Sequence, residues 1–315
     1  SVNPAGTAAV HDVEAFGHFS PSALRRNLVA SDAFVFGPGG LLQDETGIWN
    51  LPYHLRRLGP VRRVGIPWAG IGLGADGLTT DRGRSRVRRA LVGHTAIAVR
   101  DEPSADALRA LGVDRVVRAA DLAFLAEPPA VSRDGVLGVC LRAPQSGRLR
   151  PGALDAGRIW PDGRAAALAA ALDDTCRSTG LTTRFVALDA PADSVVHRQV
   201  ADRMATPAEV VEPDLDGVVG ALARVDAVAT MRYHGAVLAA LGGAAVVALP
   251  HSPKLRSLAA DLGPGATVHD DEAEGLAAAV SGVLAGRSHL ADAVDRLRTL
   301  AGRNVEVLDS LLEAA

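Results

Sequence analysis

Only one of the 33 basic residues in this chain is a lysine, and all the others are arginine. That residue, Lys254, follows an apolar run and comes directly after His251-Ser-Pro253. A lysine ammonium is a compact point charge that suits a small anion, and Ser252 is a further candidate for anion binding. Taken alone, Lys254 is equally well explained as a surface residue.

Other cationic or titratable side chains also follow directly after expected strands: Arg142, Arg232 and His234. The strands concerned, including the one before Lys254, are expected at residues 136–141, 226–230 and 244–249. In parallel α/β sheets, ligands bind at the carboxyl ends of strands, where helix N-termini offer unpaired N–H groups. Arginine suits planar carboxylate and phosphate groups, and a histidine exchanges protons near neutral pH. We therefore expect a site for an anion that carries a phosphate and a carboxylate, although each residue alone is more often a surface residue.

The elements that must position these groups alternate between short apolar runs and Ala/Leu/Arg-rich helical stretches. This alternation predicts an α/β protein with two doubly wound, Rossmann-like domains facing across a cleft. The polar, proline-rich segment Glu127–Asp134 is the expected linker, which gives domains at residues 1–130 and 131–315. Additional strands are expected at residues 33–36, 63–66, 96–99, 115–117 and 183–188, and helices at 104–111, 164–180, 235–241 and from 271 onward. Two glycine-rich segments, at residues 37–40 and 70–74, are expected as turns and do not fit a dinucleotide fingerprint.

Composition excludes several function classes. The net charge of −3, without a basic tail, disfavours nucleic-acid binding, and no apolar run is long enough to span a membrane. Cys140 and Cys176 have no metal-type spacing, which favours a reducing, cytoplasmic setting. We expect at most peripheral contact with a membrane, and the composition is also compatible with an oligomer.

A set of short motifs, in order along nearly the whole chain, is similar to the polysaccharide pyruvyl transferases. The motifs are Gly39-Gly-Leu-Leu-Gln-Asp44, Gly70-Ile-Gly-Leu73, Val99-Arg-Asp-Glu-Pro-Ser104, Asp121, Leu141-Arg142, Arg232-Tyr-His-Gly235 and Pro253-Lys254. The resemblance implies a glycosyltransferase-B-like fold with the acceptor on the N-terminal domain and the donor on the C-terminal domain. Ser1–Thr7 is similar to the second strand of the family, whose first strand and loop the sequence does not contain. Leu122 replaces a proline that is common in the family.

The resemblance implies transfer of pyruvate from phosphoenolpyruvate to two hydroxyls of a sugar, which gives a pyruvate ketal on a cell-wall glycan or its precursor. Residue chemistry and the family pattern both assign the general acid to His234. Arg142, Arg232, Lys254 and Ser252 are expected to bind the donor. Phosphoenolpyruvate is then a co-substrate, and we expect no cofactor and no metal because the cations already supply positive charge. The sugar acceptor is free, lipid-linked or nucleotide-linked, and a lipid carrier would place the reaction at the inner face of the membrane.

The acceptor side has one main candidate, Asp44, to orient or deprotonate a sugar hydroxyl. A cap for the following segment is an equally good interpretation of Asp44. Asp101 and Glu102 are expected to cap a helix, and the role of Asp121 stays open. Trp49 and Trp68 are aromatic side chains that would suit a sugar face, although packing is the more common role.

Two other functions remain open on the sequence. A nucleotide-sugar glycosyltransferase of the same fold would place a diphosphate over the same helix, but it needs an acid for the donor ribose, for which Asp261 is the nearest residue. A non-catalytic glycan-binding relative would be expected to lack the acid or a cation. All four side chains, Arg142, Arg232, His234 and Lys254, are present.

Overall fold

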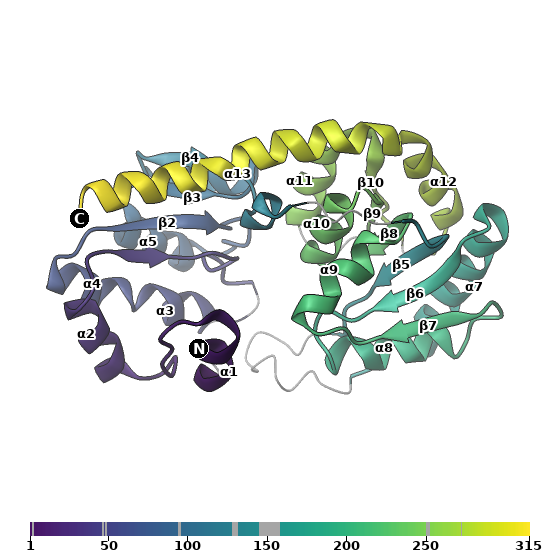
Figure 1. Cartoon of the computed structure of the whole chain (residues 1–315), viewed down its shortest axis with the longest axis horizontal. Helices are drawn as coiled ribbons and strands as arrows, with labels where there is room; N and C mark the ends of the chain where they lie inside the picture. Colours follow the sequence, from purple (N-terminus) through teal and green to yellow (C-terminus); the bar gives the residue numbers. More distant parts are fainter. Residues whose placement is uncertain are drawn as a thin grey trace.

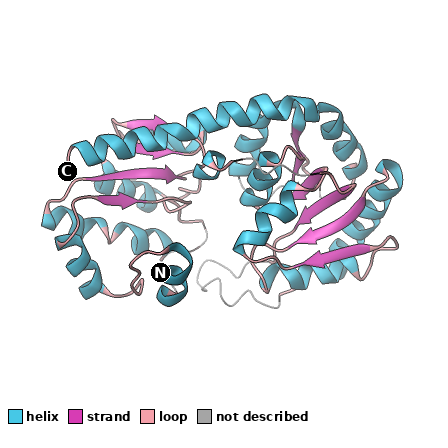
Figure 2. Ribbon diagram, in the orientation of Figure 1, coloured by secondary structure: helices cyan, strands magenta, loops and turns pink. Residues whose placement is uncertain are grey.

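The computed structural model describes residues 1, 3–45, 47, 49–93, 96–127, 132–144, 158–249, 253–271 and 273–315. Two separate parallel sheets form the framework (Figures 1 and 2). The first has the strand order β1-β2-β3-β4, and the second has the order β10-β9-β8-β5-β6-β7. This confirms the expected α/β fold with two Rossmann-like halves. The boundary near residue 130 stays a prediction, since residues 128–131 lie outside the described part.

The N-terminal half has its four short strands covered by helices. Its elements are α1 (Pro4–His11), α2 (Pro21–Val29), β1 (Phe34–Phe36), α3 (Asn50–Leu55), α4 (Leu58–Val64), β2 (Trp68–Leu73), α5 (Asp81–Leu91), β3 (Ile97–Val99), α6 (Glu102–Ala110), β4 (Val116–Arg118) and the short 3₁₀ helix η1 (Leu122–Leu125). Three expectations are wrong here. The segment 70–74, expected as a turn, lies largely in strand β2. Of the residues likened to a strand, Pro4–Thr7 belong to α1, because Asn3 caps a helix that opens on Pro4. The strand expected at 63–66 is the end of α4 and Gly65, whose φ of 82° ends that helix.

The C-terminal half holds the larger sheet. Its elements are β5 (Val136–Cys140), α7 (Asp162–Thr179), β6 (Thr182–Val186), α8 (Ala192–Ala201), β7 (Ala208–Val211), α9 (Leu215–Ala223), β8 (Ala227–Thr230), α10 (Tyr233–Leu241), β9 (Ala245–Ala248), α11 (Pro253–Leu262), η3 (Gly263–Gly265), β10 (Ala266–Val268), α12 (Leu276–Gly286), η4 (Arg287–His289) and α13 (Leu290–Glu313). The edge strands β7 and β10 were not expected. The central order β9-β8-β5 brings together the three strand ends that carry the expected site.

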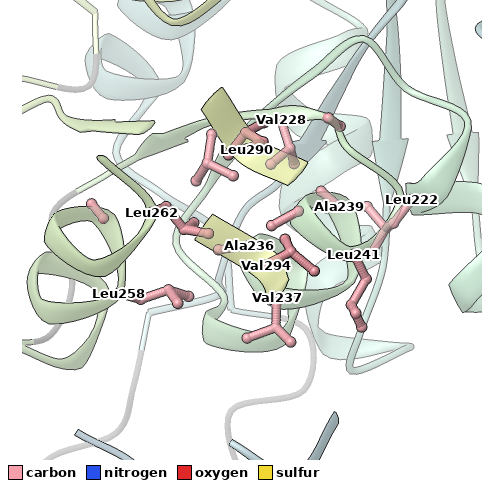
Figure 3. Close-up of a cluster of buried hydrophobic side chains, with 14 of the residues drawn as sticks. Leu222, Val228, Ala236, Val237, Ala239, Leu241, Leu258, Leu262, Leu290 and Val294 are labelled. Atoms are coloured by element: carbon pink, nitrogen blue, oxygen red, sulfur yellow. The ribbon is translucent and has the colours of Figure 1, made fainter. Parts of the chain in front are cut away.

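Helix α10 is the most deeply packed helix of this half and fixes the start of the site. Its apolar side chains lie among those of the surrounding helices, as Figure 3 shows for Ala236 and Val237 beside Leu258 and Val294. Small residues on α10 let it lie close to the sheet. Burial of this cluster holds the first turn of α10 in a fixed place, because interiors packed at this density resist displacement.

The last helix, α13, joins the two halves. It begins beside the larger sheet and ends over the smaller one (Figure 1), where Val307 and Leu311 pack on Ala69, Ala98 and Ala119. The C-terminal end of the chain therefore covers the N-terminal sheet. The expected division into residues 1–130 and 131–315 did not anticipate this crossing of α13 to the other half.

Asn304, buried in α13, is hydrogen-bonded to two segments of the N-terminal half. Its Oδ1 accepts the N–H of Gly72 at 2.8 Å, and its Nδ2 donates to the carbonyl of Ala120 at 3.0 Å. Gly72 has φ of +59° and interrupts the register of β2 with β3, so its N–H is displaced from the regular ladder. The amide of Asn304 satisfies this group and also anchors the segment that leads to η1.

Replacing Asn304 by leucine is expected to lower the free energy of unfolding by about 2–5 kcal/mol, because two buried backbone groups lose their partner. Thermal and urea unfolding measure this. Thr299→Ala, on an exposed part of the same helix, is the control and should change little. A leucine variant as stable as the control would contradict the assignment.

Candidate functional site

The first turn of α10 carries the central histidine, and local packing explains the sequence around it. A Cβ on Gly235 would lie 2.6 Å from Oγ1 of Thr230 and 3.2 Å from Sγ of Cys140, so only glycine fits against β8 and β5. Arg232 is the N-cap residue, in an extended conformation and without a side-chain cap. The first N–H groups of α10 therefore have no capping oxygen from Arg232, as suits an anion site.

Arg232 is held by a buried aspartate. Its Nε donates to Oδ2 of Asp193 at 3.0 Å, and its Nη2 donates to Oδ1 of the same residue. Asp193 is completely buried at the start of α8, and Asp189 lies 3.4 Å from Nη2. A paired, buried carboxylate of this kind fixes the guanidinium rigidly. The main task of Arg232 in this arrangement is to tie α10 to α8, and its expected role in donor binding stays a prediction.

His234 lies at the domain boundary with its side chain 57 % exposed. Its Nε2 is 3.7 Å from Oδ2 of Asp121, which comes from the segment between β4 and η1. An exposed imidazole on a rigid helix start is accessible to a ligand. The structure gives His234 an acidic neighbour, and its expected role as general acid stays a prediction.

Lys254, in the first turn of α11, is half-buried and faces the N-terminal half. Its Nζ lies 6.0 Å from the ring centre of Tyr233. Burial lowers the pKa of Lys254, and the charge of Arg100 lowers it further, whereas the carboxylate of Asp76 opposes this effect. Lys254 is therefore a desolvated ammonium between a cation and an acid, in contact with the buried ring of Tyr233.

Arg142 follows β5, and its positive charge repels those of Lys254 and Arg232. Burial lowers the pKa of Arg142, with a further lowering from Arg232, while Asp193, Asp189 and Glu45 raise it. An arginine nevertheless stays protonated at any physiological pH. Arg142, His234 and Lys254 thus follow the adjacent strands β5, β8 and β9, and their expected roles in one site stay a prediction. Ser252 lies outside the described residues.

Asp44 is largely buried, and its carboxylate is fully engaged. Its oxygens accept hydrogen bonds from the backbone N–H and the hydroxyl of both Thr79 and Thr80, just before α5. Burial acts to raise the pKa of Asp44, but these four bonds outweigh burial and the pKa lies below its ordinary value. The geometry favours the interpretation as a local cap, because a base would have to break these bonds. Asp173 makes the same kind of contact with Ala205 and Thr206.

Replacing Asp44 by asparagine is expected to lower the free energy of unfolding at pH 7 by about 1–3 kcal/mol, because the amide nitrogen faces donors. Because the pKa of Asp44 is lower in the folded than in the unfolded protein, its ionised carboxylate stabilises the fold at pH values above the unfolded pKa. That stabilisation is lost as the pH falls through the folded pKa. The difference between wild type and variant should therefore begin to shrink as the pH falls below about 4. Urea unfolding from pH 3 to 7 tests this, with exposed Asp106→Asn as the control; a pH-independent difference would contradict it.

Several charged groups of the site were not expected from the sequence. Arg100, after β3, is buried and lies 3.8 Å from Asp76, 3.4 Å from Asp101 and 3.9 Å from Asp121. Its guanidinium carbon is 4.5 Å from the ring centre of Tyr233. Arg100 stands inside the motif Val99–Ser104, and Asp76 follows β2 at the same sheet edge, so position at a strand end was the signal that would have found both.

The remaining sequence candidates, for contacts to a sugar acceptor or to a nucleotide, lie at separate places in the fold. Asp101 caps α6 through the N–H of Ser104, as expected. Trp68 is buried in β2, whereas Trp49 is 75 % exposed just before α3. Asp261 accepts a hydrogen bond from Arg118 at 2.8 Å, a contact between the two halves.

The described residues offer neither a metal-binding cluster nor a membrane-spanning helix. They contain no group of three or more histidine, cysteine, aspartate or glutamate side chains placed to hold a metal ion. None of the helices in the described part is both long and apolar enough to cross a membrane.

Solved structures similar to this chain share its fold at low sequence identity. UDP-GlcNAc 2-epimerase from Neisseria meningitidis, bound to UDP-GlcNAc, gives a TM-score of 0.58 at 10 % identity over 97 % of this chain and 88 % of that one. Anabaena HepE in complex with UDP gives 0.53 at 15 % identity, over 95 % and 82 %. A Staphylococcus aureus TarM mutant with fondaparinux, alpha-GlcNAc-glycerol and UDP gives 0.52 at 10 % identity; this chain covers 54 % of that protein's length, and 83 % of this chain is covered. These likenesses show a glycosyltransferase-B-like fold.

Family membership comes from the sequence itself. No curated protein sequence gives a significant match. The sequence profile described as polysaccharide pyruvyl transferase, however, matches residues 7–253, which include the strand ends with Arg142 and His234. The chain therefore belongs to the polysaccharide pyruvyl transferase family, a family of transferases in polysaccharide biosynthesis.

Proposed function

We propose that the protein transfers pyruvate from phosphoenolpyruvate to two hydroxyls of a sugar and forms a pyruvate ketal on a cell-wall glycan or its precursor. One observation carries this proposal: Arg142, His234 and Lys254 follow the adjacent strands β5, β8 and β9 at one edge of the sheet, and the charge of Arg142 acts on Lys254. A donor with a phosphate and a carboxylate needs two cationic contacts and a proton donor within a few ångströms.

The anion-binding groups divide between side chains and backbone. Arg142 supplies a planar guanidinium for one anionic group of the donor, and Lys254 supplies a point charge for the other. The uncapped first turn of α10 adds N–H groups and the positive end of the helix. Arg232, held by Asp193, adds positive charge behind these groups. These fixed cations then stabilise the negative charge that develops on the departing phosphate.

The reaction needs one proton at the methylene carbon of the donor, and we assign its delivery to His234. The electron pair of the carbon–carbon double bond takes this proton, which leaves an oxocarbenium-like centre. A sugar hydroxyl adds to that centre and loses its proton, and the carbon–oxygen bond to phosphate breaks. A second hydroxyl then adds to the same carbon, loses its proton and closes the ketal. The general acid contributes roughly 10²–10⁴-fold in rate in such steps.

The acceptor is proposed to enter from the N-terminal half. Glu45 and Asp76 are the acids whose charges reach Lys254 from that side, so they bound the space opposite the donor cations. Burial raises the pKa of Asp76, and Asp101 raises it further. Carboxylates at this edge suit contacts to sugar hydroxyls, a role for which Asp44 is not available.

The second candidate function is a nucleotide-sugar glycosyltransferase. Two of the three similar structures described above are UDP complexes and the third contains UDP-GlcNAc, which favours this alternative. Against it, the carboxylate of Asp261, the nearest acid for a donor ribose, is bound by Arg118. A third function, glycan binding without catalysis, predicts loss of the acid or of a cation, and Arg142, His234 and Lys254 are all present.

Phosphate release tests the donor directly. Purified protein is incubated with phosphoenolpyruvate and a panel of free, lipid-linked and nucleotide-linked sugars, and the same panel is run with UDP- and GDP-sugars. The proposal predicts acceptor-dependent release of phosphate from phosphoenolpyruvate. Turnover of a nucleotide sugar alone would replace the proposal by the glycosyltransferase, and binding without any turnover would leave the glycan-binding function.

We also propose that the reaction takes place in the cytoplasm, without a cofactor beyond the co-substrate. Both cysteines, Cys140 and Cys176, are buried thiols and not a disulfide, as is usual in a reducing compartment. A lipid-linked acceptor would be presented at the inner face of the membrane and would require only peripheral contact.

A further inference from the structure

Asp121 is the acid that faces the exposed imidazole of His234 across the domain boundary. Its Oδ2 lies 3.7 Å from Nε2 of His234. Its other oxygen, Oδ1, accepts the backbone N–H of Ala123 at 3.1 Å, at the start of η1. Because this cap uses one oxygen, the other is the one available to His234.

The segment that carries Asp121 is rigidly held. The carbonyl of Ala120 accepts a hydrogen bond from buried Asn304, and Phe124 of η1 is completely buried. Helix η1 packs against both α10 and α13. The distance between Asp121 and His234 is therefore set by two packed elements, one from each side of the boundary, and not by an exposed loop.

The charges around the pair keep Asp121 ionised. Nη1 of Arg100 lies 3.9 Å from the same Oδ2 that faces His234. Burial acts to raise the pKa of Asp121, but the contact with His234, the Ala123 cap and the charge of Arg100 outweigh it, so the pKa lies below its ordinary value. Three other ionisable groups surround this pair: Tyr233 on α10, Asp101 on α6 and Asp261 on α11. Burial raises the pKa of Tyr233, and the charges of Asp101 and Asp261 raise it further.

We propose that Asp121 is a positioning residue that holds Nε2 of His234, so that Nδ1 is the nitrogen that delivers the proton to the donor. This inference rests on the proposed function and names the partner of its acid. In the step, the Nδ1–H bond breaks as a C–H bond forms at the methylene carbon of phosphoenolpyruvate. The positive charge passes from the ring to the donor, and the neutral imidazole keeps its Nε2–H directed at Asp121.

Asp121→Asn is the test variant, because asparagine keeps the Oδ1 acceptor for Ala123 and removes only the charge. Turnover is expected to fall at least about tenfold while the KM for phosphoenolpyruvate stays within about threefold, because the acid loses its support and the donor contacts remain. This split between turnover and KM separates a positioning role from a damaged donor site, which would lose donor binding as well.

The matched control is Asp261→Asn, which breaks the contact of Asp261 with Arg118 across the same boundary without touching His234. This variant should leave turnover and KM within about threefold of wild type. Turnover of Asp121→Asn equal to that of wild type, or an equal loss in the control, would overturn the inference.

A second readout does not depend on activity. In protein with ¹⁵N-labelled histidine, the ring resonances of His234 are assigned by their loss in His234→Gln. The neutral ring should carry its proton on Nε2, which faces Asp121, and this preference should weaken in Asp121→Asn and not in Asp261→Asn; an unchanged tautomer balance would overturn the pairing. If wild type releases no phosphate from phosphoenolpyruvate, the proposed function fails, and this tautomer measurement still decides whether Asp121 and His234 interact.

Discussion

His234→Gln is expected to lower turnover by on the order of 10²–10⁴-fold while phosphoenolpyruvate still binds. Glutamine keeps a polar group near Nε2 but has no proton to deliver at physiological pH, and the cations Arg142 and Lys254 are unchanged. Steady-state kinetics of phosphate release measure turnover, and calorimetric titration with phosphoenolpyruvate measures binding. Loss of binding with residual turnover would instead assign His234 to anion recognition.

The control for this variant is His289→Ala, an exposed histidine in η4 that does not contact the site. Its kinetics should equal those of wild type. Thermal unfolding of both variants excludes a folding defect, because His234 is exposed and its replacement removes little buried surface.

Lys254→Met is expected to raise the KM for phosphoenolpyruvate and to lower turnover, with a combined loss in kcat/KM on the order of 10²-fold or more. Methionine keeps the length and the apolar stem of lysine, so packing beside Tyr233 is retained while the ammonium is lost. Folding should be intact, since burial already lowers the pKa of Lys254 and its charged form is not a source of stability.

Arg256→Met, on the same helix, is the matched control. Arg256 is exposed and paired with Asp270, away from Tyr233. This variant removes one positive charge from α11 and should leave both kinetic constants within about twofold, because an exposed ion pair contributes little. Equal losses in the two variants would show that only the net charge of the helix matters, and unchanged kinetics of Lys254→Met would remove Lys254 from the site.

Most strands were predictable because their residues are apolar and bounded by polar turns, as in β5 and β9. The edge strands β7 and β10 were not, because their side chains are only partly buried and form no apolar run. Strand β2 was hidden by its glycines. A Cβ on Gly70 would lie 2.7 Å from a methyl of Leu73 and 3.0 Å from one of Ile97, so this glycine serves close packing within a strand and not a turn.

The site was predictable as far as strand ends allow. Parallel strands end at one edge, so Arg142, His234 and Lys254 could be placed together once β5, β8 and β9 were expected to be neighbours. The pairing of Arg232 with Asp193 was not predictable, because no sequence pattern connects the start of α8 to that of α10. Which acids of the N-terminal half lie opposite Arg142 and Lys254 depends on how the two halves pack. The hydrophobic periodicity of the sequence carries no information about that packing.

The most direct test of the central claim is to run the reaction with phosphoenolpyruvate and the active acceptor in D₂O and to examine the product by NMR. Protonation of the donor methylene followed by ketal closure predicts a pyruvate ketal whose methyl group carries one deuterium, formed together with phosphate. A product without solvent deuterium in that methyl group, or sugar transfer from a nucleotide sugar with phosphoenolpyruvate unchanged, would contradict it.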